Sequence, residues 1–306
     1  ETVFIVREKF DFFKRCPCTR RAVPCGYHLL NLGFGCPLDC SYCFLQSYSN
    51  APGLVFPANI EDFFARFSEY EESPAARAWK RGENLRLGTG EFSDSLALDR
   101  LTGYSLPLIE FFREKGGCLF EFKTKSAEVA NLLRARHGGN IVAGWSVNPE
   151  RVIRENEAYA APLSARIAAA QRCAEAGYRL AFHFDPILFY PGWEKDYGEV
   201  VESLAGAIGA ERIAWISLGT LRFHPELKPV IENRWPDNTI LDGELVVGVD
   251  GKLRYPDPDR YRIYRTMLAA LGKWSPRLPI YLCMESEAMW KELKLPFPFG
   301  NGLGGM

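Results

Sequence analysis

The chain has 306 residues, enough for one large α/β domain with appendages or for two modest domains. Its hydrophobic content of 47% and charged content of 25% are ordinary for a globular protein. Its net charge of −1 argues against extensive phosphate binding. No apolar run reaches the roughly 18 to 20 residues that cross a bilayer, and the charged N-terminus has no signal-peptide core. We therefore expect a cytoplasmic protein with no membrane partner.

Short apolar strands alternate with amphipathic helices along the chain, which predicts a parallel sheet with helical crossovers. In chain order, the strands are expected at residues 27–34, 84–91, 118–126, 140–149, 178–187 and 212–223. The helices are expected at residues 59–72, 96–116, 127–137, 162–177 and 192–209. Six β/α units fall short of a closed barrel of eight, so the sequence predicts an α/β fold with a partial (β/α)6 TIM-type barrel. In such folds, ligands gather at the carboxyl ends of the strands.

The predicted barrel occupies residues 27–236. Residues 1–26 form a cysteine-rich segment ahead of it. After Pro236 the pattern changes to a hairpin-like stretch, a helix at residues 257–274 and a short strand. We expect residues 237–306 to form a small C-terminal extension.

Nine cysteines are present, and six of them precede residue 44. In a chain without signs of secretion, clustered cysteines indicate metal or cluster ligands rather than disulfides. Cys36, Cys40 and Cys43 follow the first predicted strand at the spacing C-x3-C-x2-C. A structural zinc site needs four ligands, whereas a 4Fe–4S cluster held by three thiolates keeps one iron free to bind a small molecule. A zinc site completed by a distant Cys or His is the alternative.

This spacing, with Tyr42 just before the third cysteine, resembles the signature loop of the radical S-adenosylmethionine family. From about residue 25 to residue 236, further stretches resemble one branch of that family, the spore photoproduct lyases. These stretches are CSYCFLQSY, SDSLALD, FKTKSAEVANLL, WSVNP, RIAAAQRCAEAGYRLAF, PILFYPGWEKDY and LRFHPELKPVIENRWP. The resemblance implies that a 4Fe–4S cluster cleaves S-adenosylmethionine to a 5′-deoxyadenosyl radical, which abstracts hydrogen from a substrate. A flavodoxin- or ferredoxin-type reductant would supply the electron.

The same resemblance implies that Lys125 and Ser146 help to hold S-adenosylmethionine. A Lys ammonium can neutralise the methionine carboxylate, and a Ser hydroxyl can donate one hydrogen bond. A surface Lys and a buried strand Ser are the plain alternatives.

The chain departs from the lyases at Glu91, which stands where they place a hydrogen-donating Cys shortly before the Ser93-Asp94 pair. A carboxylate cannot return a hydrogen atom to a carbon radical as a thiol can. Glu91 ends G-T-G-E, which resembles a Gly-Gly-Glu element whose acid accepts hydrogen bonds from the methionine ammonium; an ordinary turn with a solvated Glu is the alternative. Phe44 replaces the Tyr that follows the third cluster Cys, while Tyr42 is retained. Tyr42 and Glu91 are therefore the candidate catalytic residues. We expect that this protein is not a standard thymine-dimer lyase.

Three upstream cysteines, Cys16, Cys18 and Cys25, lie in a polar stretch with two prolines and no apolar periodicity. They predict a possible second iron–sulfur cluster, with Cys283 as a candidate fourth ligand. A zinc site or three unligated cysteines are the alternatives.

Near the ends of the fifth and sixth predicted strands, His183, Asp185 and Arg222 could face the barrel mouth. A lone His is more often a satisfied core residue, and Arg222 is as well explained by an ordinary ion pair as by a phosphate or carboxylate ligand.

The sequence thus predicts a lyase-like radical enzyme, and the first expectation for its substrate is a nucleic acid lesion or modified base. A radical enzyme acting on a peptide or small metabolite is the second hypothesis. A non-catalytic protein that binds a metal or a cluster is the third.

Overall fold

The computed structural model describes residues 2–7, 13–19, 21–48, 53–73, 76 and 85–297, so the end of the predicted C-terminal extension, residues 298–306, lies outside the described residues. At the centre lies an eight-stranded sheet in the order β13-β9-β8-β7-β6-β5-β3-β2. Its strands are β2 (Phe13–Arg15), β3 (Tyr27–Leu30), β5 (Leu85–Gly88), β6 (Cys118–Thr124), β7 (Ile141–Ser146), β8 (Arg179–Ile187), β9 (Ile213–Thr220) and β13 (Ile280–Leu282). Neighbouring strands pair in parallel, except β2 and β3, which are antiparallel.

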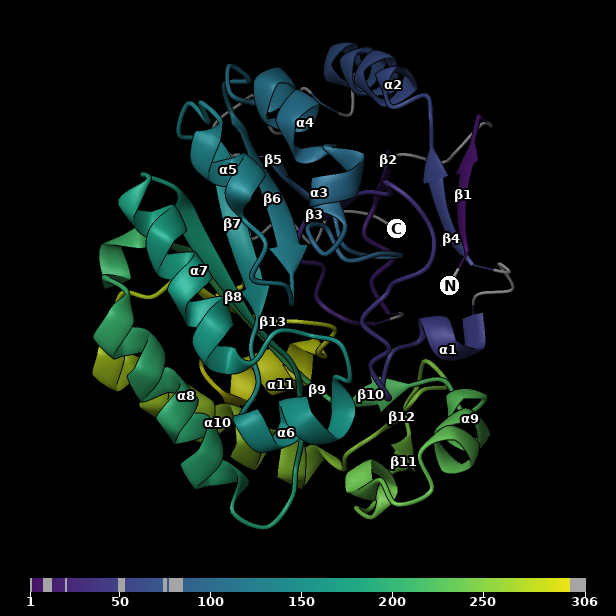
Figure 1. Ribbon diagram of the computed structural model, residues 1–306. Helices are drawn as coiled ribbons and strands as arrows, with labels where there is room; N and C mark the ends of the chain where they lie inside the picture. The colour runs from purple at the N-terminus through teal and green to yellow at the C-terminus, as the bar shows by residue number, and fades with distance from the viewer. Residues whose placement is uncertain are drawn as a thin grey trace.

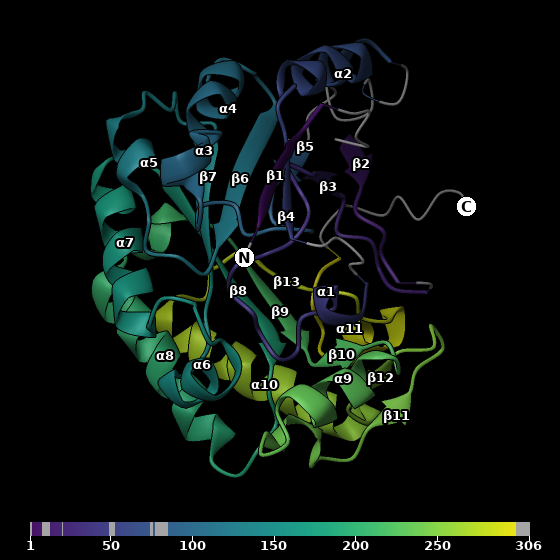
Figure 2. The same ribbon diagram turned by 45° about the vertical axis from the view of Figure 1, so that its right-hand side comes forward.

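The sheet curls into an open half-barrel, and helices α4, α5, α7 and α8 lie along its outer face (Figures 1 and 2). The helices are α1 (Leu45–Tyr48), α2 (Glu61–Glu72), α3 (Asp99–Thr102), α4 (Ser105–Phe112), α5 (Ala130–Arg134), α6 (Glu150–Asn156), α7 (Leu163–Glu175), α8 (Trp193–Ala207), α9 (Leu227–Arg234), α10 (Asp257–Trp274) and α11 (Glu287–Glu292). The predicted partial barrel and each of its six strands are confirmed. No helix among the described residues is long and apolar enough to span a membrane.

The segment predicted as mostly helical at residues 96–116 divides into α3 and α4. Gly103 lies between them with φ 63, in the left-handed region, and its N–H bonds to the Asp99 carbonyl. Glycine enters that region without a Cβ penalty, so it ends α3 and lets the chain turn into α4.

Segments from both sides of the predicted barrel contribute strands to the same sheet. β2 pairs with β3 at one edge, and β13 pairs with β9 at the other. Two smaller sheets accompany the half-barrel. In the first, β1 (Val3–Val6) pairs in parallel with β4 (Leu54–Pro57). In the second, β12 (Leu253–Arg254) lies between β10 (Arg222–Phe223) and β11 (Val246–Val247). The antiparallel pair β11 and β12 is the predicted hairpin.

Parallel strands covered on both faces contain long apolar runs. Accordingly, every residue of β7 and β9 is buried. On the helix side, ring packing is dense: the Phe112 and Phe120 rings stack with centroids 4.3 Å apart.

Within the half-barrel one group of buried polar side chains is mutually satisfied. His183 bridges Glu121 Oε1 and Ser217 Oγ, each at 2.6 Å, and the Tyr27 hydroxyl donates to the other Glu121 oxygen. This is the satisfied core histidine that the sequence suggested. Gly144 makes room for the network, because a Cβ there would lie 2.2 Å from Glu121 Oε1.

We predict that Gly144→Ala destabilises the protein by about 1–3 kcal/mol, since Glu121 is held by two partners and cannot move aside freely. The urea midpoint of unfolding measures this change. Gly198→Ala is the matched control, because Gly198 lies in α8 with no atom near its missing Cβ. That control should be neutral or stabilising by up to about 1 kcal/mol, and a Gly144→Ala midpoint equal to the wild type would contradict the packing described.

Candidate functional site

The predicted site residues gather at the carboxyl ends of four neighbouring strands, β3, β5, β6 and β7. The cysteine loop follows β3, Glu91 follows β5, Lys125 follows β6, and Ser146 ends β7. Sequence order separates these segments, and the parallel sheet brings them to one edge, at the lower end of the half-barrel in Figure 1.

The thiols of Cys36, Cys40 and Cys43 lie close enough for their charges to interact. The loop is pinned from within and from α6: the Cys43 N–H donates to the Cys40 carbonyl at 3.1 Å, and Ser41 donates from its N–H and its hydroxyl to Asn156. Burial raises the pKa of Cys36 to about 12 and raises the pKa of the other two thiols as well. A metal that binds here must therefore displace thiol protons.

Lys125 is the cation of this site. Burial disfavours its charge, but the neighbouring Cys40 thiol and Glu157 carboxylate outweigh burial and raise the pKa of Lys125. Its Nζ lies 5.6 Å from the centroid of the Tyr42 ring. Lys125 is half-buried, with its charge beside two of the three loop thiols.

Glu157 lies beneath the cysteine loop and was not found by sequence reasoning. Its carboxylate accepts hydrogen bonds from the Tyr42 hydroxyl, from Asn148 Nδ2 at 2.9 Å and from Arg166 Nη2. Both Glu157 and Arg166 are fully buried, and Arg166 also donates to the Ser146 carbonyl at 2.9 Å. Although burial would raise the pKa of Glu157, the charges of Arg166 and Lys125 lower it. The segment around Glu157 has no motif or spacing that could have revealed this role.

Asp94 joins the end of β5 to the end of β6. Its Oδ1 accepts from the N–H groups of Leu96 and Ala97 and from Thr124 Oγ1 at 2.6 Å, while its Oδ2 accepts from the Lys125 N–H at 2.8 Å. In the sequence Asp94 served only as a landmark beside Ser93. In the structure it fixes the backbone that carries Lys125.

Glu91 is mostly buried, with 14% of its side chain exposed, so it is not the solvated residue of the plain alternative. Its carboxylate pairs with Lys14 Nζ of β2 at 2.9 Å. The preceding Gly90 has φ 99, in the left-handed region that favours glycine, and a Cβ there would press on the Lys123 carbonyl at 3.1 Å. Lys14 came from the N-terminal segment and had no signal in the sequence.

Asp185 and Arg222 form a two-point ion pair, with N–O distances of 2.9 and 3.1 Å. Burial opposes the charge of Asp185, but Arg222 outweighs it and lowers the pKa of that carboxyl. Arg222 therefore has the ordinary ion-pair partner that the sequence left open.

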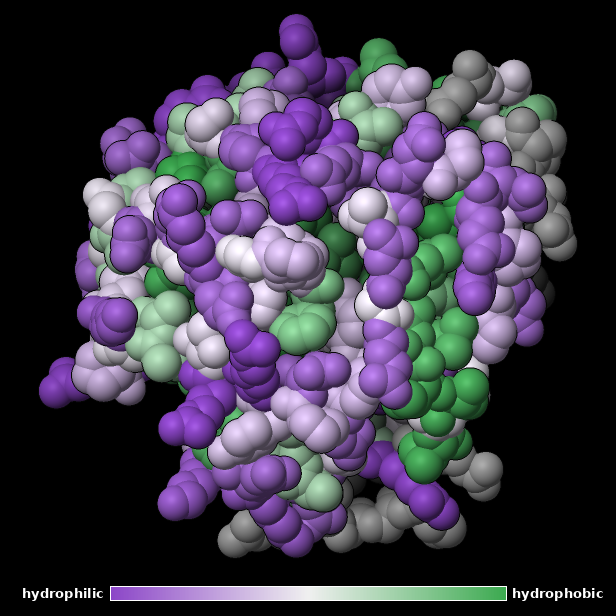
Figure 3. All heavy atoms as spheres, turned by 90° about the horizontal axis from the view of Figure 1, so that it is seen from below, coloured by the Kyte–Doolittle hydropathy of each residue, from purple (hydrophilic) through white to green (hydrophobic). Residues whose placement is uncertain are grey.

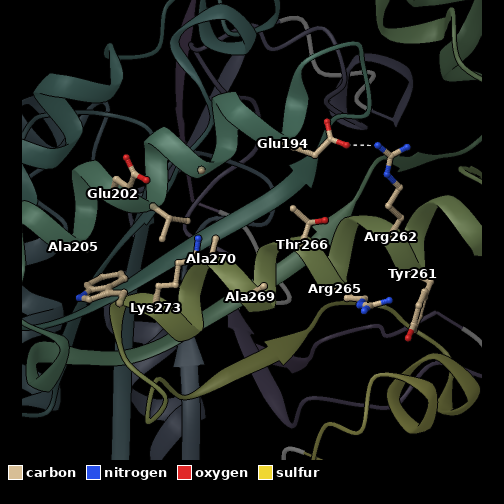
Figure 4. Close-up of a pocket in the computed structure, with 13 residues that line it drawn as sticks. Glu194, Glu202, Ala205, Tyr261, Arg262, Arg265, Thr266, Ala269, Ala270 and Lys273 are labelled. Carbon is tan, nitrogen blue, oxygen red and sulfur yellow. Dashed lines mark hydrogen bonds and ion pairs between the residues drawn. The ribbon is translucent and has the colours of Figure 1, made fainter.

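A groove lies elsewhere, on the outer helices α8 and α10 (Figure 4). It encloses about 710 Å³, and an ion pair between Glu194 and Arg262 spans it at one end. None of the predicted site residues lines it. A smaller hollow does lie at the site, lined by residues 89–95 among others.

No group of three or more His, Cys, Asp or Glu side chains within the described ranges is arranged to hold a single metal ion.

An open half-barrel with a three-cysteine loop at the carboxyl ends of its strands is the architecture of radical S-adenosylmethionine enzymes. The family model described as "Spore photoproduct lyase" matches residues 3–252, and the chain belongs to that family. It is therefore an enzyme of the radical S-adenosylmethionine lyase type, a class that uses a 4Fe–4S cluster and S-adenosylmethionine. The predicted family and the prediction of an enzyme are confirmed.

Curated relatives and solved structures agree. The chain is 29% identical over 283 residues to a spore photoproduct lyase of Geobacillus sp. (strain Y412MC61), covering 89% of this chain and 78% of the relative. It is 30% identical over 243 residues to that of Bacillus subtilis (strain 168), covering 78% and 67%. A cysteine-to-alanine mutant of spore photoproduct lyase with dinucleoside spore photoproduct matches with a TM-score of 0.76 and 29% identity, over 92% of this chain and 82% of that one. A double mutant with bound AdoMet and the same dinucleoside matches with a TM-score of 0.76 and 28% identity over the same shares.

We predict that Glu157→Ala destabilises the fold by about 3–5 kcal/mol, because it leaves Arg166 as a buried charge without a counter-charge. Chemical denaturation measures the loss. Glu155→Ala is the control two residues away: Glu155 pairs with Arg151 at 3.1 Å, but both side chains are at least 40% exposed. That surface pair should contribute no more than about 1 kcal/mol, and equal losses for the two variants would refute the role given to Glu157.

Proposed function

We propose that Cys36, Cys40 and Cys43 hold the 4Fe–4S cluster of this enzyme, and that its substrate is related to nucleic acid. The observation that carries the proposal is the arrangement of one buried and two half-buried thiols at the carboxyl end of a strand, with the Lys125 ammonium beside Cys40 and Cys43. When bound, the cluster and S-adenosylmethionine supply the 5′-deoxyadenosyl radical that abstracts hydrogen.

The side chains present suit that cofactor pair. Thiolates are soft ligands for iron–sulfur clusters, and the Lys125 charge lowers the cost of ionising Cys40 and Cys43. Lys125 would also neutralise the methionine carboxylate, with Ser146 as a hydrogen-bond donor close by in the sheet. Glu91 would receive the methionine ammonium by exchanging it for Lys14, its present partner.

Tyr42 is the proposed catalytic residue of the cysteine loop. It is buried, and its hydroxyl donates to Glu157. Glu157 is the base in position to hold the phenol proton of Tyr42. Arg166 remains as the counter-charge to Glu157 throughout.

Aromatic side chains beside the site support a nucleobase as substrate. The Phe92 ring stacks with Phe34 at 4.9 Å and with Tyr48 at 5.6 Å between centroids, and Lys14 Nζ lies 4.6 Å from the centre of Phe92. Tyr48 is 62% exposed and Phe44, at the edge of the group, is 39% exposed. Exposed rings stack bases without regard to sequence. Figure 3 views the molecule from below Figure 1, and on that face a strip of hydrophobic side chains lies between hydrophilic ones.

The substrate is proposed to differ from that of a standard thymine-dimer lyase. Glu91 replaces the hydrogen-donating Cys, and its carboxylate is already paired with Lys14. Phe44 has no phenol to relay a radical. The structures of relatives with dinucleoside spore photoproduct support the chemical class of the substrate, a nucleic acid component, rather than its identity.

A flavodoxin- or ferredoxin-type reductant would supply the electron. A second iron–sulfur cluster, with Cys16, Cys18, Cys25 and Cys283 as its candidate ligands, is a separate proposal that this function does not require.

The test is formation of 5′-deoxyadenosine from S-adenosylmethionine by the anaerobically reconstituted chain with dithionite. Lys125→Met should weaken S-adenosylmethionine binding by roughly 10- to 100-fold per iron-loaded chain, the cost of one charge-assisted contact. The control is Lys195→Met, since Lys195 is 80% exposed on α8. Equal affinity in the two variants would remove Lys125 from the proposal, and no deoxyadenosine from the wild type would sink the function itself.

With dinucleoside spore photoproduct as substrate, we predict that the wild type forms deoxyadenosine but releases no repaired dinucleotide above background. The reason is that no thiol stands at position 91 to return the hydrogen atom. Liquid chromatography with mass detection measures both products. Stoichiometric repair by the wild type would show that the substrate is the standard one.

A further inference from the structure

The half-barrel is open between its edge strands, β2 at one end of the sheet and β13 at the other. The segment between β2 and β3 reaches the chain that follows β13. The Val23 N–H donates to the Glu285 carbonyl at 2.9 Å, and Ala22 forms an antiparallel bridge with Ser286. The Thr19 hydroxyl donates to Met284 Sδ at 3.4 Å. The segment that precedes β3 and the segment that follows β13 therefore meet at this seam.

Four cysteines lie at the seam, three from the N-terminal side and one from the C-terminal side. The Cys18 thiol lies close enough to interact with the thiols of Cys16 and Cys25, and the Cys18 N–H donates to the Cys16 carbonyl at 2.8 Å. Cys283, the residue after β13, lies close enough to Cys25 for their charges to interact. None of the four forms a disulfide. The four cysteines, which are far apart in the sequence, therefore lie together in the folded chain.

Two arginines accompany these thiols. Arg86 donates to the Cys25 carbonyl at 3.4 Å, and its guanidinium lies over the rings of Trp215 and Tyr281 at 4.3 and 4.5 Å. Its Nε and Nη2 are buried and make no hydrogen bond of good geometry within the described part of the chain, with the Tyr281 hydroxyl as the nearby group. Unused donors inside a protein are costly, and an anionic group beside Cys25 would satisfy these N–H groups.

The second arginine is Arg222. Its Nη2 donates to Cys283 Sγ at 3.4 Å, and the same guanidinium pairs with Asp185. Hydrogen bonds and positive charge at the sulfur ligands stabilise a cluster and tune its potential. Both ends of the cysteine group therefore have a cation in contact.

We propose that Cys16, Cys18, Cys25 and Cys283 bind a second iron–sulfur cluster, ligated by all four thiolates, which fastens the open seam of the half-barrel. This proposal rests on the proposed function in one respect: both require that the chain binds iron and sulfide. Because no iron is left free, the second cluster does not bind S-adenosylmethionine or substrate; it links the two edges of the barrel and can pass electrons.

The spacing favours a cluster over zinc. Zinc hooks place two cysteines two to four residues apart, whereas Cys16 and Cys18 are separated by one residue and Cys25 follows after six more.

The experiment measures iron, zinc and acid-labile sulfide in the anaerobically purified and reconstituted chain. The wild type should hold about eight irons, and a Cys36→Ala, Cys40→Ala, Cys43→Ala variant about four, the number in one cubane. Adding Cys283→Ser to that variant should at least halve the remaining iron. Adding Cys173→Ser instead should not change it, because Cys173 is buried on α7 away from the seam.

If the variant without Cys36, Cys40 and Cys43 holds neither iron nor sulfide while the wild type holds about four irons, the second cluster is overturned and the proposed function stands. One zinc per chain in place of iron overturns it equally. Should that variant fail to fold, Cys16→Ser, Cys18→Ser, Cys25→Ser decides the matter: iron must fall from about eight to about four while deoxyadenosine formation from the first cluster remains detectable. An electron paramagnetic resonance signal of the second cluster that shifts on adding S-adenosylmethionine would refute full ligation.

Discussion

The buried ion pair between Glu157 and Arg166 is the interaction on which the site depends. The backbone of Glu157 forms a β-bridge with Cys40, and its carboxylate accepts a hydrogen bond from the Tyr42 hydroxyl. The same carboxylate interacts electrostatically with Lys125. Arg166 fixes the same carboxylate from α7 and holds the carbonyl of Ser146 at the end of β7. A charged pair in this interior is tolerated only because hydrogen bonds satisfy nearly every polar atom around it. The ion pair thereby fixes the positions of the cysteine loop, Lys125 and Ser146 relative to one another.

The interior of the half-barrel follows the same rule. Glu121, His183, Ser217 and Tyr27 satisfy one another where a closed barrel would be filled by apolar layers. Gly144 supplies the space for them. Arg86 is the exception, with two donors unused among the described residues, and it lies at the seam where Cys25 and Cys283 meet. Trp215 Nε1, on the ring that packs 4.3 Å from the Arg86 guanidinium, is a second buried donor without a hydrogen bond among the described residues.

The periodicity of the chain was sufficient to predict the barrel. Runs such as those of β7 and β9, buried at every residue, have an apolar content that only strands covered on both faces tolerate. Helix α10 was predicted with its observed bounds, and a Pro in its first turn marks its start. The division of residues 96–116 into α3 and α4 was missed, because a single Gly in a helical pattern can either be tolerated or end the helix. At the site, the cysteine spacing and Lys125 were found because they form short motifs.

The sequence by itself determined the strands and helices, the three-cysteine loop and the family, because these depend on local periodicity and on residues close together in the chain. Only the tertiary structure decided that Glu157 and Arg166 support the loop, that Lys14 pairs with Glu91, and that Cys283 reaches Cys25. Each of these contacts joins segments whose separation along the chain has no periodic signature. They are selected by the curvature of the sheet and by the requirement that buried charges meet a partner.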